Sequence, residues 1–406
     1  MRGHHPLSRG GAGQGPVRTT SPEGAVLLAC ALVDRDRAGR ILAAHLPAVR
    51  DWDGLRGAAV LHGVAPLLYR LVHRSAADAI PPGELEALHA LSVANERRNL
   101  RLSGRLLRVL DVLRTAGIEA LPVKGPVMAE AIYGDVGLRQ FADLDIAIRP
   151  GDVAAARGAL VAQGFRQTTG VGVAVDRLLA SEGGVAFESA DGELVLDLHW
   201  RLGPRFAGAS LPAEELLAEA RPARFLGHDV LALSARDLFV VLCVHGSHNH
   251  RWDRLELVAA LGACGAALQD EQWLDLLERA GRLGCRRRCA IGCLLMREVA
   301  GRDLPSAAAA RLDRERLALR LASAARGGMF ADGLDPPVRE GLGGIVWESL
   351  ALDHPAQMPA HFAARVLTPG IHDWGDGEGP AGWPAKYYLT RPVRLASRLL
   401  RRGDTG

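Results

Sequence analysis

The chain has 406 residues, and at roughly 150 residues per domain that length predicts two or three structural units. Hydrophobic residues make up 48% and charged residues 23%, which excludes a wholly disordered chain, a fibrous repeat and a membrane bundle. The 49 basic and 46 acidic residues leave a net charge of +3, so nucleic acid and anionic membranes are not expected partners.

Residues 1–20 are rich in Gly, Arg and Ser, and we expect them to be disordered. The apolar stretch Ala25–Val33 follows a good helix start at Ser21 and lacks a small-residue cleavage site. We therefore interpret it as a core helix rather than a secretion signal, and expect a cytoplasmic protein. Leucines at three-to-four spacing predict a helical region over 21–116, in which 95–99 form an exposed turn of one long helix.

The pattern changes over 117–205, after Gly117 ends the helical region. There we expect an α/β core with short helices and a small mixed sheet, including two strands around the turn Asp191-Gly192. The strands are expected at 118–123, 144–148, 185–189 and 194–200. Residues 206–365 are predicted to be helical, and 366–406 a Gly/Pro-rich loop followed by a basic helix. The expected fold class is α+β, with a small mixed β-sheet unit flanked by helical regions.

Three carboxylates mark the predicted strands. Asp143 and Asp145 lie two residues apart on one strand, so both side chains point to the same face, with Cα atoms about 6–7 Å apart. Asp197 lies in an otherwise apolar strand and shares its face with His199. If these strands are neighbours, the three carboxylates converge on a site suited to Mg²⁺, which prefers oxygen ligands. The alternative is a solvated strand end, which is common for an Asp-x-Asp pair.

A possible phosphate site precedes these acids. Lys124-Gly125-Pro126 joins a strand to a helix N-terminus, where backbone N–H groups and the helix dipole favour anions. Lys124 is one of only two lysines in the chain, and Arg139 could bring a planar cation to a triphosphate. The alternative is a plain turn with an exposed lysine.

Taken in order, Lys124-Gly125, Arg139, Asp143-Leu144-Asp145 and Asp197-Leu198-His199-Trp200 resemble the nucleotidyltransferase superfamily related to DNA polymerase β. Within it, the chain is similar to an uncharacterised bacterial nucleotidyltransferase group often found in peptide natural-product gene neighbourhoods. The similarity extends over about 25–395 and is strongest at 118–200.

The resemblance implies two Mg²⁺ ions, an NTP such as ATP, and in-line attack of an acceptor on the α-phosphate with loss of pyrophosphate. The acceptor could be a small molecule or a peptide. The resemblance implies that Asp143, Asp145 and Asp197 are catalytic metal ligands, that Asp197 also takes the acceptor's proton, and that Gly125 lets the phosphates approach the backbone. We expect Lys124, Gly125, Arg139 and His199 to bind the nucleotide, although the superfamily pattern assigns no role to His199.

One departure from the superfamily pattern keeps two alternatives open. Pro126 stands where the superfamily usually has Gly or Ser, which removes a hydroxyl and an N–H donor from the phosphate cradle. The chain could therefore be a catalytically silent binding or scaffold protein. A third possibility is an antitoxin-type enzyme that nucleotidylates a partner protein.

Two further clusters have no assigned role. His245, His248 and His250 are expected to line the cleft of the α/β core, and His245 or His248 could face the nucleotide, with a metal as the weaker alternative. Cys285, Cys289 and Cys293 share one helix face and are expected to be buried free thiols rather than metal ligands with Cys264.

Overall fold

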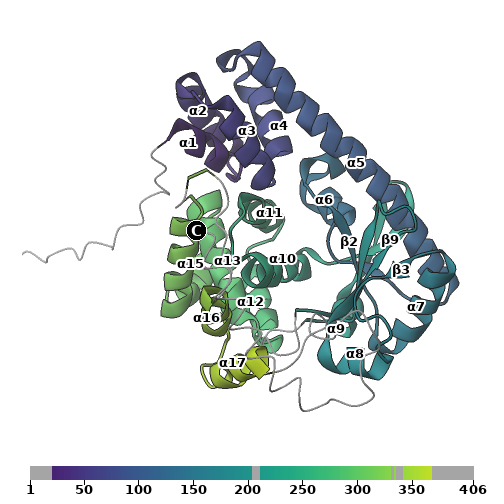
Figure 1. The fold of residues 1–406 in the computed structure, drawn as a ribbon. Helices are drawn as coiled ribbons and strands as arrows, with labels where there is room; N and C mark the ends of the chain where they lie inside the picture. Colours follow the sequence, from purple (N-terminus) through teal and green to yellow (C-terminus); the bar gives the residue numbers. More distant parts are fainter. Residues whose placement is uncertain (1–20, 204–210, 331–332, 335–341, 368–406) are drawn as a thin grey trace, which may run out of the picture.

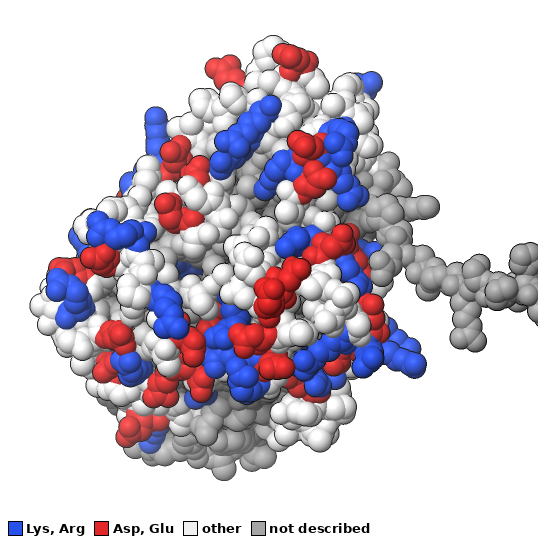
Figure 2. Space-filling view, turned by 180° about the vertical axis from the view of Figure 1, so that it is seen from behind, with Lys and Arg blue, Asp and Glu red and all other residues white. Residues whose placement is uncertain are grey.

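The computed structural model describes residues 21–203, 211–330, 333–334 and 342–367 (Figure 1). The expected tail at 1–20 lies outside the described residues, as do 368–406 of the expected Gly/Pro-rich loop and basic helix. None of the helices described has the length and apolar character needed to cross a bilayer. On the face seen in Figure 2, acidic and basic side chains are interspersed, in keeping with the near-neutral net charge.

The N-terminal part is helical, as expected. Its α-helices are α1 Pro22–Ala29, α2 Arg35–His45, α3 Trp52–Leu61, α4 Ala65–Ser75 and α5 Pro82–Thr115. The side chain of Ser21 accepts a hydrogen bond from the Gly24 N–H, which caps α1 as the sequence predicted. Helix α1 ends at Ala29, short of the expected Val33.

Helix α5 has 34 residues and is therefore about 50 Å long; it runs along the α/β core (Figure 1). It ends just before Gly117, whose φ of +76° is the left-handed conformation that favours glycine at a helix end.

The prediction that residues 95–99 of α5 form an exposed turn is wrong for two of these residues. Asn95 and Asn99 are buried, and their amides donate to backbone carbonyls of the 136–139 segment. An asparagine whose amide donates to buried backbone carbonyls looks the same in sequence as a solvated one.

The α/β core contains a five-stranded mixed sheet in the order β1-β2-β5-β4-β3. The strands are β1 Leu121–Pro122, β2 Asp143–Ala147, β3 Arg166–Gln167, β4 Gly184–Glu188 and β5 Val195–His199. Strand β2 runs parallel to β5, and the other pairs are antiparallel. The hairpin turn between β4 and β5 contains Gly192 with φ +70°, as the Asp-Gly pair predicted.

The two faces of the central strands differ in chemistry. Leu144 and Ile146 of β2, with Leu196 and Leu198 of β5, point into a core that includes residues of α5 and α7. This pairing of a leucine-rich strand face with two helices buries one side of the sheet. The opposite face carries the polar residues of the same strands. The helices between the strands are α6 Pro126–Tyr133, α7 Val153–Ala162 and α8 Val175–Ser181.

The expected helical region after 206 contains a β-hairpin that the sequence analysis missed. Strands β8 Arg221–Phe225 and β9 His228–Ala232 pair antiparallel around Leu226 and Gly227, whose φ angles are +47° and +83°. Two consecutive positive φ values are typical of a tight hairpin turn. Phe225 and Val230 pack into the same core as the sheet, so tertiary burial stabilises two strands whose own apolar pattern is weak. A second, two-residue pair is formed by β6 Arg201–Leu202 and β7 Leu211–Pro212.

The rest of the described C-terminal part is helical. Its helices are α9 Ala213–Glu219, α10 Ala235–His245, α11 Leu255–Ala266, α12 Gln272–Arg282, α13 Arg286–Leu295, α14 Ser306–Leu312, α15 Arg316–Gly328, α16 Leu342–Leu350 and α17 Gln357–Leu367. All six cysteines of the chain are buried free thiols, which confirms that expectation. Figure 1 shows α10 between α13 and the sheet, with α11 beside α10.

Candidate active site

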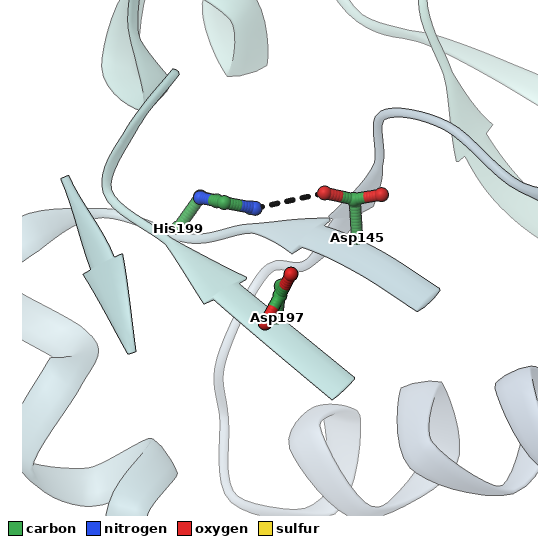
Figure 3. A group of neighbouring side chains, drawn as sticks. All are labelled: Asp145, Asp197 and His199. Atoms are coloured by element: carbon green, nitrogen blue, oxygen red, sulfur yellow. Dashed lines mark hydrogen bonds and ion pairs between the residues drawn. The ribbon is translucent and has the colours of Figure 1, made fainter. Parts of the chain in front are cut away.

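The polar face of β2 and β5 brings two of the predicted acids side by side. Asp145 and Asp197 are register partners across the parallel pair, so their side chains leave the sheet on the same face. His199 lies two residues beyond Asp197 and points the same way. Figure 3 shows the three side chains directed toward one another. Each offers one ligand atom within 4.8 Å of the others, so together they form a compact candidate metal site.

The Asp145 carboxylate is the most strongly held of the three. Its Oδ1 lies 2.7 Å from Nζ of Lys124 and 2.9 Å from Nε2 of His199, and only 3% of its side chain is exposed. Burial opposes ionisation of this carboxyl group, but the Lys124 ammonium and the His199 ring outweigh it and hold the pKa of Asp145 well below its usual range. Asp145 is therefore an anion throughout the physiological range.

Asp197 behaves in the opposite way. Burial is the main cause that raises the pKa of its carboxyl group, and the negative charges of Asp145 and Asp143 add to the effect, although His199 and Lys124 oppose it. Two neighbouring carboxylates with pKa values pushed apart are typical of sites with distinct acid–base roles. The same repulsion favours a bound cation, which would remove the cost of two adjacent negative charges.

Asp143 begins β2 and is half-buried, two residues before Asp145 on the same face. Its charge contributes to the raised pKa of Asp197, so the two carboxyl groups interact. Asp143 lies outside the tight group formed by Asp145, Asp197 and His199. The structure therefore brings two of the three predicted acids into direct proximity and leaves the third at the margin.

The turn before α6 has a backbone conformation that requires glycine. Gly125 has φ +72° and ψ −140°, a conformation essentially restricted to glycine, and it caps the helix. Pro126 occupies the first helical position, where proline fits because that N–H takes no part in the helix hydrogen bonds. The turn aligns the N-terminus of α6 with Lys124, whose ammonium pairs with Asp145.

Arg139 has a different environment from the one expected. Its side chain is only 7% exposed, and its guanidinium lies 4.0 Å from the carboxylate of Glu256 on α11. The backbone carbonyl of Arg139 accepts hydrogen bonds from the amides of Asn95 and Asn99, which fixes the segment leading into β2. Glu256, the acidic partner of Arg139, is more than a hundred positions away in the chain, so sequence spacing alone could not reveal this ion pair.

Helix α10 lies beside the cluster, as the sequence predicted for the segment that contains His245. Val241, Val244 and His245 of α10 line a small pocket together with Lys124 and His199. Burial is the main cause that lowers the pKa of His245 well below its usual value, and the nearby Lys124 charge acts in the same direction. His245 is therefore a neutral imidazole beside the cluster.

The other two histidines of this run face elsewhere. His248 lies 3.7 Å from Glu348 and His250 lies 3.6 Å from Asp253. Both sit on a π-helical turn over Gly246–His250, where a side chain at Gly246 would collide with the buried Trp252 ring. Of the three, His245 is thus the one that lines the pocket beside Lys124 and His199.

A mixed sheet whose parallel strands present paired carboxylates beside a Lys-Gly turn is the arrangement expected of a nucleotidyltransferase. The family model described as uncharacterised nucleotidyltransferase matches residues 48–301, and the chain belongs to that family. Family membership classes the chain as a transferase. No curated protein matches the sequence.

Proposed function

We propose that this protein transfers a nucleoside monophosphate from ATP, or another NTP, to a small-molecule or peptide acceptor, with Mg²⁺ as the metal. The observation that carries the proposal is the alignment of Asp145 with Asp197 across two parallel strands, beside Lys124. A structural role alone would not favour a half-buried Asp197 beside the buried Asp145, because Lys124 compensates mainly Asp145 and the charge of Asp197 would be stabilised by a further cation.

The donor set fits a magnesium ion. Asp145 and Asp197 supply carboxylate oxygens, and Asp143 lies next to them on the same strand face. The hydrogen bonds and ion pairs of the Asp145 carboxylate with other described residues all involve Oδ1. Its second oxygen would hold the metal together with Asp197 and Asp143. When bound, the metal would stabilise negative charge on the α-phosphate and on the entering and leaving oxygens.

Side chains of the protein would carry out the other parts of the proposed transfer, namely nucleotide binding and proton removal. Lys124 would exchange its contact with Asp145 for triphosphate oxygens, and Gly125 would let the phosphates approach the backbone at the start of α6. His199 keeps Asp145 oriented through the bond to Oδ1 and contacts the nucleotide. Asp197 would accept the proton of the attacking group, a role for which a raised pKa makes it a stronger base than an ordinary carboxylate.

The surrounding elements would bind and select the acceptor. We propose that the α/β core, 117–205, performs the chemistry, and that the helical regions 21–116 and 206–365 select the acceptor. The guanidinium of Arg139 is buried within ion-pair distance of Glu256. Arg139 would therefore act on the triphosphate through its positive charge rather than through direct contact. His245 would present a neutral ring to the nucleotide or acceptor.

Pro126 is the observation that favours the silent alternative. It removes one N–H from the N-terminus of α6, although proline suits this helical position. A catalytically silent binding protein would retain the cluster and lose nucleotide binding. A protein-modifying transferase of antitoxin type would retain both the carboxylate cluster and nucleotide binding, and would differ only in its acceptor.

The test begins with nucleotide binding. ATP with MgCl₂ should raise the melting temperature of the full chain, and ATP with EDTA should not. Asp145→Asn and Asp197→Asn should abolish the shift, whereas Asp176→Asn, an exposed acid on α8, should retain it. Transfer is then followed with ATP labelled at the α-phosphate or at the γ-phosphate, incubated with hydroxyl- or amine-bearing compounds, peptides and proteins.

The α-label should enter the acceptor while the γ-label leaves with pyrophosphate. If no NTP stabilises the wild-type chain in a magnesium-dependent way, the transferase proposal fails. Stabilisation that appears only in Pro126→Ser would favour the silent alternative, since serine restores both the N–H and the hydroxyl.

A further inference from the structure

A second pocket lies away from the carboxylate cluster, where α1, α2 and α4 meet α6 and α11. Its volume is about 350 Å³, within the range of small-molecule sites. The pocket is lined by Ile132 and Tyr133, at the C-terminal end of α6. The Lys124 turn precedes the other end of this eight-residue helix, so the two sites are separated by about 12 Å of helix.

The pocket combines an apolar floor with a basic rim. Leu32, Leu67, Leu71 and Leu138 are among the apolar residues that line it, together with Ala31, just past the end of α1, and three alanines of α11. Three arginines also line it: Arg35 at the start of α2, and Arg70 and Arg74 one turn apart on α4.

The positive charge of this rim is largely uncompensated. Arg70 lies 3.6 Å from Asp135, but no carboxylate within the described ranges is within ion-pair distance of Arg35 or Arg74. Burial together with the like charges of Arg74 and Arg35 lowers the pKa of Arg70, although Asp135 opposes the change. Three guanidinium groups around one pocket, of which only Arg70 is paired with an acid, repel one another, and a bound anion would relieve that repulsion.

We propose that this pocket binds a small organic anion, with its carboxylate or phosphate group against Arg35, Arg70 and Arg74 and its hydrocarbon or aromatic body on the apolar floor. Guanidinium groups form paired, charge-assisted hydrogen bonds with carboxylates and phosphates, which suits such a head group. The floor removes the apolar body from water. The pocket is separate from the transfer site, so binding requires neither nucleotide nor metal.

Isothermal titration of the full chain, in EDTA and without nucleotide, tests the head group and the basic rim. The probes are octanoate, octyl phosphate and 1-octanol, which share one hydrocarbon chain. We expect saturable binding of octanoate, of octyl phosphate or of both, with 1-octanol at least about tenfold weaker. Arg35→Gln and Arg74→Gln should each weaken binding of the anion about tenfold. Arg40→Gln, an exposed arginine on α2 that does not line the pocket, should leave it unchanged.

Two substitutions that leave the charge of the protein unchanged test the apolar floor of the pocket. Ala263→Leu places a larger side chain in the pocket and should abolish binding, whereas Ala267→Leu, just past the end of α11 and outside the lining, should not. Asp145→Asn should bind the probe normally, which separates this site from the transfer reaction. The proposal is overturned if neither anion binds saturably, if 1-octanol binds as tightly, or if Arg40→Gln weakens binding as much as Arg35→Gln.

Discussion

Asp145 and Asp197 face each other across β2 and β5, yet their carboxyl groups have opposite pKa shifts. Lys124 and His199 both contact one oxygen of Asp145 and keep it ionised, while Asp197 receives less compensation for its burial. One acid is therefore a fixed anion, and its neighbour is suited to accept a proton. The following predictions test this division and the framework that produces it.

Asp145→Asn should abolish magnesium-dependent nucleotide binding and reduce transfer at least about 10²-fold, the usual cost of losing a preorganised charge. The substitution also leaves the Lys124 ammonium, only 14% exposed, without its carboxylate partner. Chemical denaturation should therefore show a lower free energy of unfolding, by about 3 kcal/mol. An unchanged stability would mean that the Lys124–Asp145 pair is not formed in solution.

Gly125→Ala should destabilise the protein and weaken nucleotide binding, because a Cβ atom is disfavoured at φ +72°. The expected cost is about 1–3 kcal/mol in the free energy of unfolding. The cost is local to the backbone, since atoms of the rest of the fold would lie no closer than 3.7 Å to that Cβ. The control is Gly104→Ala in the interior of α5, which should stabilise the chain by about 0.5–1 kcal/mol.

Asn99→Ala should destabilise the protein by about 2–3 kcal/mol, since it removes the amide donor of the Val136 carbonyl and leaves the Arg139 carbonyl with the longer bond from Asn95 alone. Because these bonds fix the segment that leads into β2, nucleotide affinity should fall as well. The comparison is Asn249→Ala, an exposed asparagine beside the pocket, measured by the same denaturation. Equal effects from the two variants would contradict the role of the buried amide.

His245 should make stability depend on pH. Its folded-state pKa is lowered, so as the pH falls through the ordinary histidine value of about 6.5, the unfolded chain binds a proton that the folded chain does not. Stability is thus lost on acidification, by up to about 2 kcal/mol between pH 7.5 and 5. Denaturation of His245→Gln across this range should lack that component, and His228→Gln, an exposed histidine on β9, should keep it.

The sequence by itself determined the local elements and the faces of the strands. Alternation placed Asp197 and His199 together and opposite Leu196 and Leu198, and the positions of Gly117 and Asp191-Gly192 fixed a helix end and a hairpin turn. These features depend on residues within a few positions of one another, where backbone sterics and burial periodicity act directly. The α+β class followed from the same local patterns.

Only the tertiary structure decided which distant groups meet. The parallel register that sets Asp145 beside Asp197, the partnership of Arg139 with Glu256, and the burial of Asn95 and Asn99 against the 136–139 segment all join positions tens to more than a hundred residues apart. Such contacts depend on the packing of whole elements, and a side chain's type does not reveal its partner. The β8–β9 hairpin was missed for the same reason, because its burial against the sheet outweighs a weak local pattern.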